Sequence, residues 1–123
     1  MVKENVLIVD PDQAVGRLMS MLLEVMGYNV DVVQFPEEAT KLQQRRRFDL
    51  MITEAFDQTD SLSFDVNFLG KLRTDDIPII LCSTYVAIAA IHPGCGGLAD
   101  VVAKPFEIDD LLKKVNGILH HRQ

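Results

Sequence analysis

The chain has 123 residues, of which 48% are apolar, and this suits a single domain, residues 1–123, with a sizeable core. Its formal net charge of −6 provides no electrostatic footprint for nucleic acid, so we expect no direct nucleic-acid binding. The two cysteines have neither the number nor the spacing of a disulfide framework or a metal site. The N-terminal residues predict neither a signal peptide nor a membrane span, so the expected location is cytoplasmic.

Short apolar runs alternate with segments of helical periodicity along the chain. In chain order, the predicted strands are residues 6–9, 28–33, 50–53, 78–82 and 100–103. The predicted helices between and after them are about 13–26, 35–46, 62–73, 85–91 and 108–119. Five strands alternating with five helices predict a parallel α/β sheet covered on both faces, in a doubly wound fold of the flavodoxin-like type.

The first helix has the clearest boundaries. Asp12 is the predicted N-cap and Gly27 the predicted C-terminal stop. Its apolar residues recur at spacings of three and four, which predicts a single buried face. That face comprises Val15, Leu18, Met19, Leu22, Val25 and Met26.

Polar residues follow the carboxyl ends of four predicted strands. They are Asp10, Glu54, Ser83 and Lys104. Ligands and chemistry sit at this edge of an open parallel sheet, so the four side chains are expected to converge there with Glu54 in the middle. Cys82 lies inside an apolar run and is predicted to be a small core residue.

These residues resemble the receiver domain of two-component response regulators. The resemblance covers essentially the whole chain and rests on residues 6–10, residues 48–50, Ser83 and residues 104–106. It implies a signalling domain, not an enzyme, that takes a phosphoryl group from a histidine kinase onto an aspartate after the third strand. It further implies magnesium held by acids after the first strand. A Ser or Thr and a Lys would contact the phosphoryl oxygens.

Carried over residue by residue, the resemblance is incomplete at the site. Asp10, Ser83 and Lys104 match the family, whereas Glu54 stands where the family has its acceptor aspartate. Pro11 replaces the second metal-binding acid, so Asp10 and Glu54 are the remaining metal ligands and magnesium binding is expected to be weak or absent. The acidic pocket of Asp10, Asp12 and Glu54 is therefore degenerate.

Three interpretations of Glu54 stay open. Its carboxylate pairs with Lys104 and mimics a permanently modified state, or the site has decayed and retains a binding role, or some phosphorylation persists. Asp57 is the candidate for a displaced acceptor, although an Asp there is also typical of a turn. Asp12 is the candidate for a replacement metal ligand, although the N-cap role is the favoured interpretation.

The sequence thus predicts an atypical receiver domain that is not conventionally phosphorylated and acts through protein contacts. The alternative is a phosphate-accepting receiver or phosphotransfer shuttle that uses another acid such as Asp57. An unrelated flavodoxin-like enzyme is disfavoured because no glycine-rich phosphate loop follows the first strand. The chain ends just after the last predicted helix, so no output domain is expected within it.

Residues 85–91 contain no charged side chain, which is unusual for an outer helix and predicts a protein-binding surface. The expected interface residues are Tyr85, Ile88, Ile91 and Val101. Val101 stands where the family often has an aromatic switch residue. Partners would be a histidine kinase, a downstream signalling protein, or a second copy bound through the fourth helix, fifth strand and fifth helix. The alternative is that residues 85–91 are ordinary core.

Overall fold

A computed structural model describes residues 3–56, 72, 76–84 and 98–120 of the chain. These described residues form five strands: β1 (Asn5–Val9), β2 (Asn29–Val33), β3 (Leu50–Thr53), β4 (Ile79–Ser83) and β5 (Leu98–Ala103). The helices in the described part are α1 (Gln13–Val25), α2 (Pro36–Arg45) and α4 (Ile108–His120). The helices predicted at 62–73 and 85–91 fall almost wholly outside the described residues.

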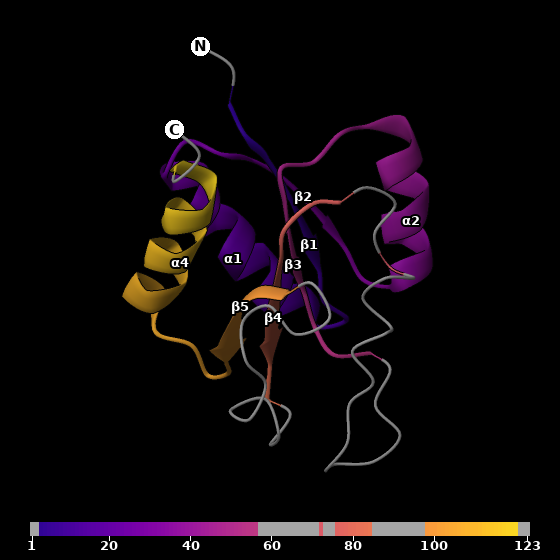
Figure 1. Ribbon diagram of the computed structural model, residues 1–123. Coiled ribbons are helices and arrows are strands. Elements are labelled where there is room, and N and C mark those ends of the chain that lie inside the picture. Colours follow the sequence, from indigo (N-terminus) through magenta and orange to yellow (C-terminus); the bar gives the residue numbers. More distant parts are fainter. Residues whose placement is uncertain (1–2, 57–71, 73–75, 85–97, 121–123) are drawn as a thin grey trace.

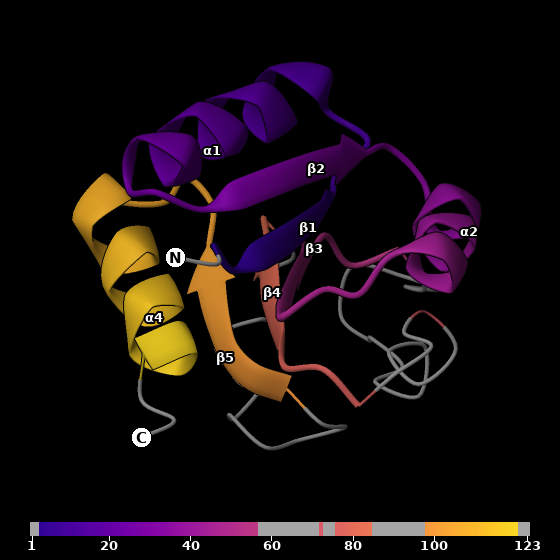
Figure 2. The same cartoon turned by 90° about the horizontal axis from the view of Figure 1, so that it is seen from above.

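The strands form one parallel sheet in the order β2-β1-β3-β4-β5. Helices α1 and α4 cover one face of this sheet and α2 covers the other (Figures 1 and 2). The order follows from two halves of the chain winding outward from β1 and β3, which places the carboxyl ends of these two strands side by side. The predicted α/β, doubly wound, flavodoxin-like fold is therefore confirmed.

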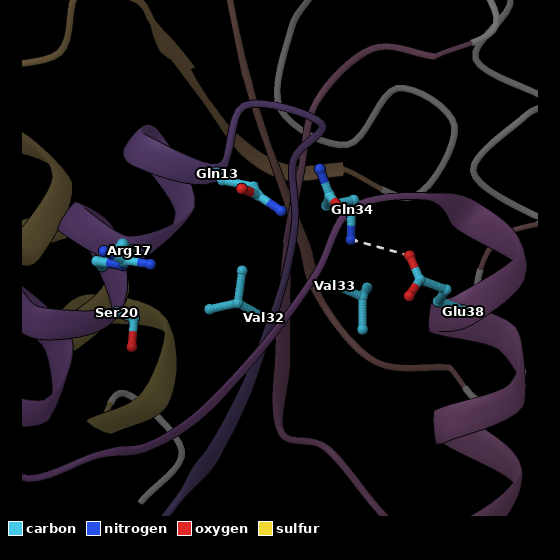
Figure 3. A pocket seen from close by; sticks show the side chains of 7 residues that line it. All are labelled: Gln13, Arg17, Ser20, Val32, Val33, Gln34 and Glu38. Carbon is cyan, nitrogen blue, oxygen red and sulfur yellow. Dashed lines mark hydrogen bonds between the residues drawn. The ribbon is translucent and has the colours of Figure 1, made fainter.

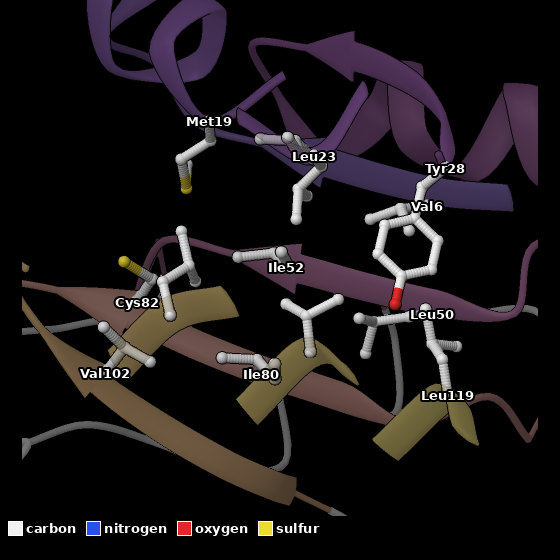
Figure 4. Packing of buried hydrophobic residues seen from close by; sticks show 13 residues of the cluster. Val6, Met19, Leu23, Tyr28, Leu50, Ile52, Ile80, Cys82, Val102 and Leu119 are labelled. Carbon is white, nitrogen blue, oxygen red and sulfur yellow. The ribbon is translucent and has the colours of Figure 1, made fainter. Parts of the chain in front are cut away.

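Alternate residues of the central strands point to opposite faces and build two cores. On the α1 and α4 side, Ile8, Ile52 and Ile80 pack with residues of both helices (Figure 4). On the α2 side, Leu7, Met51 and Leu81 pack with Ala39 and neighbouring residues. The central strands are buried on both faces, which explains why they read as continuous apolar runs in the sequence.

Helix α1 ends as predicted but buries a different stripe. The Asp12 carboxylate accepts hydrogen bonds from the backbone N–H groups of Ala14 and Val15, and Gly27 follows the C-cap with φ of +98°. The buried residues are Gly16, Met19 and Leu23. The prediction that Leu18, Val25 and Met26 belong to the buried face was wrong, since all three are exposed. Spacing alone identified apolar positions but left the direction of the stripe undetermined.

Gly16 explains how close α1 lies to the sheet. A β-carbon at this position would approach the Cγ1 atom of Val32 in β2 to 2.8 Å, which is closer than packed carbon atoms allow. Glycine therefore lets α1 lie against β2 and fixes which face of the helix turns inward. The first turn of α1, which begins just after Asp10, is positioned by the same contact.

Candidate functional site

The backbone places three of the predicted site residues at one edge of the sheet. Each lies one residue beyond the end of its strand and donates its N–H to the neighbouring strand. Asp10 donates to the carbonyl of Val33, Glu54 to that of Val9, and Lys104 to that of Ser83, at 2.9 to 3.0 Å. The parallel register therefore continues through these residues, so that their side chains start from a common edge.

Lys104 joins the two carboxylates. Its Nζ atom lies 2.5 Å from Oδ2 of Asp10 and 2.9 Å from Oε1 of Glu54. The Asp10 side chain is 2% exposed and that of Lys104 is 10% exposed, so these are charge-assisted hydrogen bonds largely shielded from solvent. One ammonium thus partly neutralises two neighbouring carboxylates that would otherwise repel each other.

Backbone groups orient both carboxylates toward the lysine. Oδ1 of Asp10 accepts from the N–H of Asp12 at 2.9 Å, and Oε2 of Glu54 accepts from the N–H of Ala55 at 2.7 Å. Burial lowers the pKa of Lys104, but the hydrogen bonds to Asp10 and Glu54 outweigh it and raise the pKa above its ordinary value. Lys104 is therefore held as a cation.

The described residues do not fit a magnesium site of the usual kind. Within the described ranges, no group of three His, Cys, Asp or Glu residues is arranged to hold a metal ion. Pro11 offers no side-chain oxygen, Asp12 uses its carboxylate to cap α1, and the Lys104 ammonium lies against both Asp10 and Glu54. A divalent cation would have to displace that ammonium and find further oxygen ligands.

A pocket opens beside this ion pair. It has a volume of about 570 Å³ and is bordered by Asp12, Glu54, Thr84 and Lys104 together with the apolar wall Val15, Leu18, Pro105, Phe106 and Ile108. Sequence reasoning missed this wall, because α1 and the segment after β5 are far apart in the chain. The signal available in the sequence was the Pro105-Phe106 pair directly after Lys104.

Two further predicted site residues lie on β4 and β5. Ser83 ends β4 opposite Ala103 and is 2% exposed. Val101 in β5 is half-buried against the α2-side core, and its carbonyl accepts from Nζ of Lys114 at 2.9 Å. Asp57, Tyr85, Ile88 and Ile91 lie outside the described residues.

A second, smaller pocket lies beside the edge strand β2. It has a volume of about 360 Å³ and is lined by side chains of α1, β2 and the start of α2 (Figure 3). There, Oε1 of Glu38 accepts hydrogen bonds from the backbone N–H groups of Gln34 and Phe35 at the start of α2. These contacts stabilise the N-terminus of α2.

Cys82 lies in the core beneath the site and is 1% exposed, as predicted. Burial raises the pKa of its thiol to about 12. In a Cys95→Ser variant, where Cys82 is the only thiol, we expect alkylation of the native protein to be roughly a thousandfold slower than that of the unfolded chain. Mass spectrometry of timed samples with and without denaturant measures this ratio, and rapid labelling of the native protein would contradict the buried placement.

Comparison with known proteins places the chain in a family. Residues 6–116 match the family described as the response regulator receiver domain. The transcriptional regulator RpaA of Synechocystis is 27% identical over 117 residues, which cover 94% of this chain and 48% of that protein. The cell cycle transcriptional regulator CtrA of Caulobacter vibrioides is 24% identical over 116 residues, with 94% and 50% covered. The chain spans about half the length of these curated relatives.

Solved structures show the same fold. A response regulator from Thermotoga maritima superposes with a TM-score of 0.81 at 25% identity, covering 97% of this chain and 99% of that one. The chemotaxis response regulator CheY4 of Vibrio cholerae superposes with a TM-score of 0.77 at 24% identity, covering 96% and 100%. None of the helices in the described part has the length and apolar character needed to cross a membrane. The family match over most of the chain, together with the fold, shows that the chain belongs to the response regulator receiver domain family.

Proposed function

We propose that this receiver domain works without a conventional phosphorylation cycle, with the Glu54–Lys104 pair in place of a phosphorylated aspartate. The observation that carries the proposal is the ammonium of Lys104, which Oε1 of Glu54 contacts at 2.9 Å. In the family pattern, this lysine contacts the phosphoryl group. Here, the longer Glu side chain itself supplies an anionic oxygen to the lysine.

The same geometry disfavours Glu54 as a nucleophile. Phosphoryl transfer depends on in-line positioning and on a cation that neutralises the developing charge. One Glu54 oxygen is bonded to Lys104 and the other to the Ala55 N–H, while Pro11 withholds a metal ligand. Signalling would then proceed through protein contacts whose strength does not change with phosphorylation.

Incubation with acetyl phosphate and magnesium, followed by intact mass measurement, tests the proposal. We expect no phosphoryl mass gain on the wild-type chain. The control is a conventional receiver domain treated in parallel under the same conditions. A stoichiometric gain of phosphoryl mass would contradict the proposal. If the phosphoryl group mapped to Asp57, the alternative of a displaced acceptor would be established.

Magnesium affinity provides an independent test. We expect calorimetry at neutral pH to give a dissociation constant at least about tenfold weaker than that of a receiver with both acids, because a lost carboxylate ligand removes one or more kcal/mol. A Pro11→Asp variant should recover part of the loss. Tight stoichiometric binding by the wild type would overturn the expectation and indicate that Asp12 has left its capping role.

The partner is proposed to be a histidine kinase or a downstream signalling protein. The surface predicted from the sequence, with Ile88, Ile91 and Val101, is the first place to look for it. The relatives RpaA and CtrA are transcriptional regulators and are about twice as long as this chain. A downstream partner that itself binds nucleic acid is therefore one proposed output of this domain.

A further inference from the structure

Helix α1 carries an apolar strip on its outer side. The strip consists of Leu18, Met21 and Val25, whose exposed fractions are 45%, 58% and 86%. Single exposed apolar residues are ordinary, but three in line at spacings of three and four form a continuous surface. The opposite side of α1 holds the buried residues that face the sheet, and α1 lies on the outside of the molecule (Figure 2).

Two charges border this strip on one side. Arg17 and Glu24 are the only charged residues of α1. On a helix of 3.6 residues per turn, both lie roughly 40 to 60° to one side of Met21. Leu18 and Val25 lie about as far to the other side of Met21 by the same helical geometry. The surface therefore has an apolar edge, a charged edge and Met21 on its midline.

This pattern is complementary to itself in one orientation. We propose that α1 is the contact between two copies of this chain, with the two helices antiparallel about a twofold axis at Met21. Arg17 of one copy then faces the partner's Glu24, and Leu18 faces the partner's Val25. Met21 meets its own symmetry mate, as an isologous interface requires. A parallel pair would instead set each charged edge against an apolar edge.

The two charged groups are available for this contact. Among the described residues, Arg17 has no salt-bridge partner, and it lines the smaller pocket beside β2 (Figure 3). Glu24 has a long hydrogen bond, 3.4 Å, from the Ser20 hydroxyl. A carboxylate accepts several hydrogen bonds, so this one leaves room for a guanidinium.

The size of the surface sets the expected strength. Stable complexes bury about 800 Å² on each partner, and a contact centred on one helix falls below that. Unbranched Met21 adapts its shape to its mate, which suits a small interface. The expected result is a weak dimer, with a dissociation constant of about 10 to 100 μM. This inference is independent of whether any acid is phosphorylated.

Sedimentation velocity over a concentration series of the whole 123-residue chain tests the proposal. The wild type should approach twice the monomer mass at the highest concentrations. Met21→Lys places two ammonium groups on the twofold axis and should abolish the dimer. Arg17→Glu alone, or Glu24→Arg alone, brings like charges together twice and should weaken association roughly tenfold. The double reversal restores both pairs and should return to within about threefold of the wild type.

Lys41→Glu on the exposed side of α2 makes the same charge change away from the strip and should leave the association constant unchanged. Circular dichroism and thermal unfolding establish that each variant is folded. If Met21→Lys does not fold, the charge-reversal variants test the proposed dimer. A wild type that stays monomeric throughout overturns the proposal. So does a double reversal no better than the single ones. Loss of the dimer in Ile88→Lys but not in Met21→Lys would place the contact on the 85–91 surface instead.

Discussion

Replacing Lys104 by methionine is expected to lower the free energy of unfolding by about 3 kcal/mol, the low end of the cost of breaking a buried ion pair. Methionine keeps most of the aliphatic stem but removes the ammonium that contacts both Asp10 and Glu54. The Asp10 carboxylate, which is 2% exposed, would then lie next to a second carboxylate with no cation between them. Urea unfolding of both proteins at neutral pH measures the difference.

The two carboxylates should contribute unequally. Glu54→Gln leaves the Lys104–Asp10 pair in place and alters a residue nearer to solvent, so about 1 kcal/mol is expected. The glutamine carbonyl can still accept from the Ala55 N–H. Asp10→Asn, at the more deeply buried site, should cost more than Glu54→Gln.

A fully neutral triple variant separates charge from packing. Asp10→Asn, Glu54→Gln and Lys104→Met together remove the ion pair without leaving a buried charge, and such replacements are often nearly neutral. We therefore expect the triple variant to be more stable than Lys104→Met alone. Lys113→Met on the exposed side of α4 is the matched control and should change little. A Lys104→Met protein as stable as the wild type would show that the carboxylates are not held against each other.

The second large effect is a gain of function. The double variant Pro11→Asp, Glu54→Asp is expected to go from no detectable phosphorylation by acetyl phosphate and magnesium to nearly stoichiometric phosphorylation. Shortening Glu54 by one methylene withdraws its carboxylate by roughly 1.5 Å and opens space next to Lys104. The carboxylate introduced in place of Pro11 would supply the missing oxygen ligand for magnesium.

The single variants show which departure matters more. Pro11→Asp alone keeps Glu54 bonded to Lys104 and should remain unmodified, whereas Glu54→Asp alone should be modified slowly for lack of a metal ligand. Adding Asp10→Asn to the double variant should remove the gain. If the double variant also fails to accept a phosphoryl group, then Glu54 and Pro11 are not what prevents phosphorylation.

Much of the fold was predictable from local patterns. Each strand begins and ends within about two residues of its predicted limits, because each is a short apolar run bounded by polar or turn-forming residues. β5 begins earlier than expected, at Leu98, since the pairing with β4 extends through a register shift near Ile79. The predicted start of α1 follows from the hydrogen bonds that an aspartate makes to the first free N–H groups of a helix.

The candidate site was predictable in its members but not in its contacts. Polar residues after parallel strands must gather at one edge, which is why Asp10, Glu54 and Lys104 were expected to meet. The sequence alone left Glu54 with three interpretations. To predict the hydrogen bonds from Lys104 to both carboxylates, one must know which strands are neighbours and which side-chain rotamers the backbone N–H groups impose.

The sequence by itself determined where the five strands and the helices α1, α2 and α4 lie, that the sheet is parallel, and which charged groups reach its carboxyl edge. These follow from periodicity and chain connectivity, which are local properties. The tertiary structure alone decided that Lys104 lies between two carboxylates, and that Leu18, Met21 and Val25 face outward. The first depends on which strands lie side by side, because Asp10, Glu54 and Lys104 follow three different strands. The second depends on how α1 packs on the sheet: the close approach of Gly16 to Val32 sets the rotation of the helix, and no pattern within the helix encodes that distant contact.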